Sequence, residues 1–188
     1  MESTFYATFV GGSTVAACAP LVDSLAQHGI GALFNYSAEA SVDGNAKQSG
    51  VNSHHIEETV DAVRSAAQFK TNGSSLTALA DDIKPSLIAI KLSGLIFEPA
   101  LLSRASSALL NSSSFLRGTE LPAGVLFPNG PELSEEDHEA LKKLHQGLRS
   151  ICDEARNGGV RLFVDAEQSW YQPSSVLPSS FSVLSTRY

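Results

Sequence analysis

The chain has few cysteines and few cations, and it lacks long apolar runs. Its 188 residues include two cysteines and 13 Lys or Arg against 20 Asp or Glu, which gives a formal net charge of −7. Nucleic acid binding requires clustered basic side chains, so these scattered cations argue against nucleic acid as the main partner. Two cysteines make no disulfide framework, and we expect Cys18 and Cys152 to be buried helical thiols in a reducing compartment.

Membrane spans, targeting segments and nucleotide-binding motifs are also missing. No apolar stretch approaches the roughly 20 residues that span a bilayer, and the first residues form neither a secretory core nor an Arg-rich presequence. We therefore expect a cytosolic protein, or one whose targeting segment is not in this chain. No G-x-G-x-x-G follows a strand, and no P-loop lysine motif occurs. Neither cysteine belongs to a metal-ligand cluster, and His54 and His55 are expected to be solvated in a polar connector, so no metal site is predicted.

The chain does contain a repeated unit in which a helical pattern is followed by a short strand. At 43% hydrophobic residues it can build one real core. The predicted helices and strands alternate as 14–28 and 30–36, then 56–69 and 86–92, then a helix capped by Ser134 and ended by Gly158 and Gly159, and 160–164. This order predicts an α/β fold with parallel strands, and the missing glycine fingerprint favours a β/α barrel over an open nucleotide-binding sheet. Residues 101–131 are looser, and their second half, 111–131, is predicted to be a surface insertion.

Polar side chains follow each predicted strand, and in a barrel they would face one mouth. They are residues 35–39, Lys91 and residues 165–168. A lysine within the apolar run 87–92 needs an anion, because an unpaired buried ammonium is unfavourable. Two interpretations stay open: a structural ion pair with Asp165 or Glu39, or a contact with substrate, either with its carboxylate or as a Schiff base.

The acidic pair Asp165 and Glu167 has a functional and a structural interpretation as well. Carboxylates at the end of a strand are typical of a site, but they also cap a following helix or pair with an arginine of a neighbouring strand. Trp170 and Tyr171 are expected to pack in the protein. The serines at 112–114 lack the nucleophile elbow of an acyl-transfer site.

Four blocks of sequence together resemble the proline dehydrogenase family, particularly its fungal mitochondrial forms. They are FYATFVGG at 5–12, GIGALFNYSAE at 29–39, IAIKLSGL at 88–95 and VRLFVDAEQSWYQP at 160–173, in the order that the family has them. The resemblance implies a β/α barrel that binds FAD non-covalently and oxidises L-proline to 1-pyrroline-5-carboxylate. It also implies that the electrons pass to a membrane quinone, and that the protein acts at the matrix side of the inner mitochondrial membrane.

The resemblance also implies roles for single residues. Lys91 matches the lysine that pairs with the proline carboxylate, and Asp165 matches an aspartate that holds arginines and the substrate amine. Ala166 matches a position whose backbone touches FAD. Glu39 matches the glutamate of an ion-pair gate, whose arginine partner does not occur in this sequence. Asn35 stands where relatives often carry aspartate.

The resemblance ends near Pro173, and the tail at 174–188 has no amphipathic helical pattern. We therefore expect residues 1–173 to be the N-terminal portion of such a barrel, ending after its third strand, with a tail from mis-spliced or alternative sequence. Exposed sheet edges would then leave the chain unable to hold FAD well and prone to aggregate. Two alternatives remain. One is a Schiff-base lyase or aldolase-like barrel that uses Lys91, and the other is a non-catalytic fragment that binds the full-length enzyme.

Overall fold

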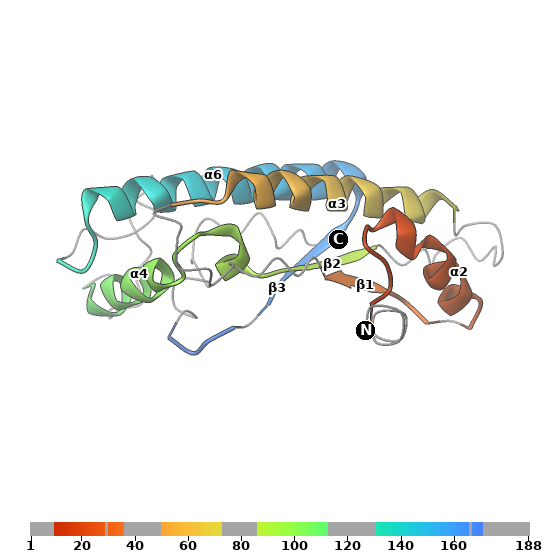
Figure 1. Ribbon diagram of the computed structural model, residues 1–188, viewed down its shortest axis with the longest axis horizontal. Helices are drawn as coiled ribbons and strands as arrows, with labels where there is room; N and C mark the ends of the chain where they lie inside the picture. Colours follow the sequence, from red (N-terminus) through yellow and green to blue (C-terminus); the bar gives the residue numbers. More distant parts are fainter. Residues whose placement is uncertain are drawn as a thin grey trace.

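The computed structural model describes residues 10–28, 30–35, 50–72, 86–112, 131–165 and 167–170. These residues form an α/β fold, which confirms the predicted class (Figure 1). Its α-helices are α2 (Ala19–Gln27), α3 (Ser53–Asn72), α4 (Ala100–Asn111) and α6 (Glu135–Gly158). Two short 3-10 helices, η2 (Ala16–Cys18) and η4 (Leu92–Leu95), accompany the strands β1 (Leu33–Asn35), β2 (Leu87–Ile90) and β3 (Arg161–Val164).

The strands form one parallel sheet in the order β1-β2-β3. Phe34 lies opposite Ile88, and Ile88 lies opposite Leu162. Consecutive strands along the chain are therefore also neighbours in the sheet, with helices in the connections, as expected of repeated helix-strand units. The long helices α3 and α6 run side by side over one face of this sheet (Figure 1).

Helix α6 begins and ends where local sequence signals place it. The Ser134 hydroxyl accepts the Asp137 N–H, while the Asp137 carboxylate accepts the Ser134 N–H, and the two bonds complete a capping box. Glu135 and Glu136 add negative charge at the positive end of the helix dipole. Gly159 ends the helix with a φ of 60°, a left-handed conformation that a residue without a Cβ adopts at little cost.

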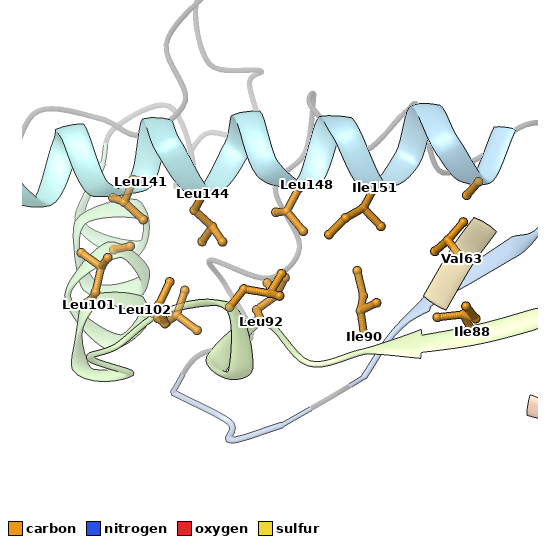
Figure 2. Packing of buried hydrophobic residues seen from close by; sticks show 14 of the residues in the cluster. Val63, Ile88, Ile90, Leu92, Leu101, Leu102, Leu141, Leu144, Leu148 and Ile151 are labelled. Carbon is orange, nitrogen blue, oxygen red and sulfur yellow. The ribbon is translucent and has the colours of Figure 1, made fainter. Parts of the chain in front are cut away.

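The core lies between these two helices, the sheet, η4 and α4. Figure 2 shows Leu144, Leu148 and Ile151 pointing from α6 toward Leu92 of η4 and Ile90 of β2. Leu101 and Leu102 of α4 extend the same cluster beneath the start of α6. This core fixes β2 and η4, and therefore the backbone on both sides of Lys91.

The two faces of the sheet differ in burial. Phe34, Ile88, Ile90, Leu162 and Val164 alternate along the strands and pack against the core. The opposite face carries Leu33 and Phe163, whose side chains are 53% and 46% exposed. Burial alternates with a period of two along β1 and β3, as is typical of strands that are covered on one side only, whereas Ala89 on the same face of the central strand β2 is buried.

Helix α2 and the histidines at the start of α3 depart from expectation. Helix α2 has no buried residue, and Cys18 is only partly buried, whereas Cys152 is buried. Both cysteines are free thiols, and burial raises the pKa of Cys152.

The prediction that His54 and His55 lie in a polar connector is wrong, because α3 begins at Ser53. The Asn52 side chain accepts the His55 N–H at 3.3 Å and so caps the N-terminus of α3.

None of the described helices combines the length and the apolar character that crossing a bilayer requires. In the same ranges, no three His, Cys, Asp or Glu side chains gather as metal ligands would.

Candidate functional site

The carboxyl ends of the three strands meet at one edge of the sheet. Asn35 ends β1, Lys91 follows β2, and Asp165 follows β3. The strands are parallel and adjacent, so the structure brings together the polar positions that the sequence placed at one mouth. Such an edge is the usual place for a site in α/β proteins.

Lys91 continues β2 by one extended residue, with φ −104° and ψ 123°. Strand alternation therefore places it on the face of Leu87 and Ala89, away from Ile90 and the helices. Its side chain is half-buried, and no ion pair joins it to Asp165 or to any other carboxylate that the structure describes. The structural interpretation as a Lys91–Asp165 pair therefore has no support, and Glu39 lies outside the described residues.

Asp165 extends the ladder between β3 and β2. Its backbone N–H donates to the Ile90 carbonyl at 2.9 Å, just beyond the last paired residues, Ile90 and Val164. The Asp165 side chain is exposed. Lys91 and Asp165 thus occupy neighbouring positions on adjacent strands, one bearing a cation and the other an anion.

Glu167 makes the most specific polar contact at this edge. One carboxylate oxygen accepts the backbone N–H of Ser93 at 3.0 Å, and the other accepts the Ser93 hydroxyl. Among the described residues, Glu167 neither caps a helix that follows β3 nor pairs with an arginine, and it binds instead to the first turn of η4. Ser93 was missed as a partner, although it stands in the block IAIKLSGL, directly beyond Lys91.

The turn η4, which contains Ser93, is also held from the side of α3. The His55 Nδ1 lies 2.7 Å from the Gly94 carbonyl, an acceptor, so this nitrogen carries the hydrogen. The Asn52 N–H donates to the Leu95 carbonyl at 2.9 Å. His55 is half-buried rather than solvated, and its contact fixes the turn that follows Lys91.

Trp170 is 55% exposed, so the described structure does not bear out its expected packing role. Tyr171, Ala166 and Glu39 lie outside the described residues. The structure therefore does not describe the residues expected to contact FAD through their backbone, at Ala166, or to form the gate, at Glu39.

The described groups fit one part of a flavin and amino acid site. A half-buried ammonium without a carboxylate partner in the described ranges suits an anionic substrate, and Asp165 beside it suits a cationic amine. Leu33 and Phe163 expose apolar surface on the sheet face that also carries Lys91, which suits the flat ring of a flavin. The described residues at this edge supply no paired cations for a dinucleotide pyrophosphate.

Comparisons with known proteins identify the family of the chain. A family model described as proline dehydrogenase matches residues 18–184. A protein named "Probable proline dehydrogenase, mitochondrial" from Schizosaccharomyces pombe is 28% identical over 180 residues, which cover 90% of this chain and 35% of that protein. "Proline dehydrogenase 2, mitochondrial" from Arabidopsis thaliana is 26% identical over 176 residues, which cover 93% of this chain and 36% of the relative.

The chain thus spans about a third of the length of these two relatives. No solved structure matches it. The family match nevertheless runs through β1, β2 and β3 and includes Lys91 and Asp165. This chain belongs to the proline dehydrogenase family.

Proposed function

We propose that this chain forms the substrate-carboxylate side of an enzyme that oxidises L-proline to 1-pyrroline-5-carboxylate with FAD. The observation that carries the proposal is Lys91, a half-buried ammonium at the carboxyl edge of the sheet with no carboxylate partner among the described residues. Family membership supports the same substrate.

The residues of this chain bind and orient the substrate. Lys91 holds the proline carboxylate through a charge-assisted hydrogen bond, and Asp165 faces the ring nitrogen. Two contacts of opposite charge at neighbouring strand ends fix the direction of an amino acid, which has one charge of each sign. Holding a reactant in one orientation lowers the barrier because the entropy of alignment is lost on binding.

FAD would supply the acceptor for a hydride from the ring carbon beside the nitrogen. Ala166 would contact FAD through its backbone, and Glu39 would form one half of a gate over the substrate. The open sheet face with Leu33 and Phe163 is one side of the site, so we propose turnover for the assembled barrel rather than for these strands by themselves. The relatives' names support a mitochondrial location. We place the enzyme at the matrix side of the inner membrane, with a quinone as electron acceptor.

The test measures the binding of L-proline to the full chain in the presence of FAD. Ligand-observed NMR detects the binding. Pyrrolidine, which has the ring and the amine but no carboxylate, is the matched probe. We expect Lys91→Met to weaken L-proline binding by about 10- to 100-fold, because a charge-assisted hydrogen bond contributes about 1.5–3 kcal/mol. Pyrrolidine binding should not change.

Lys143→Met is the control variant, because Lys143 is an exposed residue of α6 and makes no ion pair with another described residue. It should bind L-proline as the wild-type chain does. The proposal fails if the wild-type chain does not prefer L-proline to pyrrolidine, or if Lys91→Met retains that preference.

A further inference from the structure

The Glu167 carboxylate is bonded to Ser93 in η4, the turn that follows β2. Both of its oxygens accept from Ser93, one from the backbone N–H at 3.0 Å and one from the hydroxyl. These two bonds join the segment after β3 to the turn after β2. Glu167 is half-buried, so the bonds are shielded from water more than those of a surface carboxylate.

The bonded residue lies close to the proposed substrate contact along the chain. Ser93 is two residues beyond Lys91, and Lys91 is the residue that precedes η4. His55 and Asn52 hold Gly94 and Leu95 from the side of α3. Glu167 links Ser93 to the segment after β3, beside the backbone bond from the Asp165 N–H to the Ile90 carbonyl, so a shift of Ser93 would disturb the backbone of Lys91.

The contact between Glu167 and Ser93 also bears on which anion can bind Lys91. Asp165 lies next to Lys91 on the adjacent strand, and Glu167 contacts Ser93, two residues beyond Lys91, yet neither carboxylate makes an ion pair with Lys91. Glu167 gives its two oxygens to Ser93 instead. Its negative charge is thus held in place and does not neutralise the ammonium that a substrate carboxylate needs.

We propose that Glu167 is a positioning residue, which acts through Ser93 to hold Lys91 ready for the substrate carboxylate. The proposal rests on the proposed function, because it assigns Lys91 the carboxylate of L-proline as its ligand. Substrate contacts require placement to within about 0.5 Å, and a loose supporting residue is enough to lose it. Glu167 itself does not touch the substrate.

The test compares Glu167→Ala, Glu167→Gln and Ser93→Ala with the wild-type chain, again with L-proline and pyrrolidine as probes. We expect Glu167→Ala to weaken L-proline binding about tenfold and to leave pyrrolidine binding unchanged. Glu167→Gln should have a smaller effect, because the amide keeps one acceptor oxygen. Ser93→Ala should also have a smaller effect, because the backbone N–H remains. Glu57→Gln, at an exposed position of α3, is the matched control and should have none.

A double-mutant cycle separates positioning from a merely structural role. In the Lys91→Met background, Glu167→Ala should cause no further loss of L-proline affinity, because the residue that it positions is gone. A general weakening of the fold would cause the same loss in both backgrounds. Hydrogen exchange at the Ser93 amide reports the contact itself, and it should accelerate in Glu167→Ala.

The outcomes distinguish the two proposals. A wild-type chain that does not bind L-proline overturns the proposed function, and the role of Glu167 in it falls as well. A wild-type chain that binds L-proline, with Glu167→Ala binding equally well, overturns the positioning role alone. An equal loss in both backgrounds does the same. If Glu167→Ala does not fold, Ser93→Ala decides by the same cycle.

Discussion

Helices α6 and α2 have the same kind of apolar periodicity, but only α6 is built into the core. Helix α6 buries a full row of residues against α3, η4 and β2, whereas α2 buries none. Helix α6 begins with a capping box and ends at a left-handed glycine. Helix α2 has no side-chain cap, and Leu21 on its surface is 48% exposed.

The difference shows what an amphipathic pattern can and cannot predict. The pattern predicts which face of a helix is apolar, but whether that face is buried depends on the other elements that pack against it. For α6 the covering residues come from α3, from η4 and from the strands β2 and β3. For α2, no element in the described ranges buries the apolar face, although β1, the next strand, is tied to α3 through Phe34 and Phe69, whose ring centroids are 5.4 Å apart.

The largest effect on stability is expected from truncating one leucine in each of the two helices. Leu141 of α6 is 2% exposed, so Leu141→Ala should lower the free energy of unfolding by about 2–5 kcal/mol, from lost burial and the cavity left behind. Leu21→Ala in α2 should lower it by less than about 1 kcal/mol. Urea titration of both variants measures the two values. Similar losses would mean that α2 is as well packed as α6.

A second test adds a methyl group to each region instead of removing one. A Cβ on Gly158, the last residue of α6, would lie 2.7 Å from the Cβ of Ala67 in α3. Both atoms are fixed to backbone, so Gly158→Ala should force the helices apart and destabilise the protein by about 1–3 kcal/mol. Adding Ala67→Gly should restore part of the loss.

Gly31, just before β1, is the matched position in the other region. A Cβ there meets nothing within 4 Å, and its φ is not positive. Gly31→Ala should therefore leave stability unchanged or raise it by up to about 1 kcal/mol, because alanine restricts the unfolded chain. Thermal unfolding of the two variants gives the sign. Destabilisation by Gly31→Ala would reveal packing around β1 that the present contacts do not contain.

The sequence predicted the elements that depend on local signals. Ser134, the acidic first turn and the paired glycines placed both ends of α6, and the three strands were expected in parallel. The start of α3 was placed three residues late, although Asn52 was present as a capping signal. The start of β1 was placed three residues early, at Ile30, because apolar residues precede the segment that pairs with β2, and the predicted end at Tyr36 lies outside the described residues.

The site was predictable only as far as single strands determine it. Lys91 and Asp165 each follow an apolar strand, so their common edge followed from the parallel order. The contact between Glu167 and Ser93 depends on the register that sets Ile90 opposite Val164, and a sequence pattern contains no register between strands. The half-burial of His55 depends on α3 packing next to η4, which is also tertiary information.

The smallest effect on stability is expected at the ion pair between Arg104 and Asp137 at the start of α6. Among the described residues, α2 has no such ion pair. Arg104 of α4 donates to the Asp137 carboxylate at 2.6 Å and 3.2 Å, and the Ser134 N–H donates at 3.1 Å. The pKa of Asp137 is lowered, first by the hydrogen bond from Arg104, while partial burial acts in the opposite direction. Asp137→Asn should lower stability at pH 7 by about 1–2 kcal/mol.

The pH dependence gives this prediction its sign. The unfolded carboxyl titrates near its ordinary pKa of about 3.9, and the folded one titrates lower. The unfolded state therefore binds more protons in this range, so the stabilisation is present above about pH 5 and is lost as pH falls through the folded pKa. The stability difference between the wild-type chain and Asp137→Asn should shrink toward pH 3. Asp23→Asn on α2, where no ion pair is formed with a described residue, is the control and should change the free energy of unfolding at pH 7 by less than about 0.5 kcal/mol. A gap for Asp137→Asn that stays constant with pH would show that the carboxylate acts through shape alone and not through its charge.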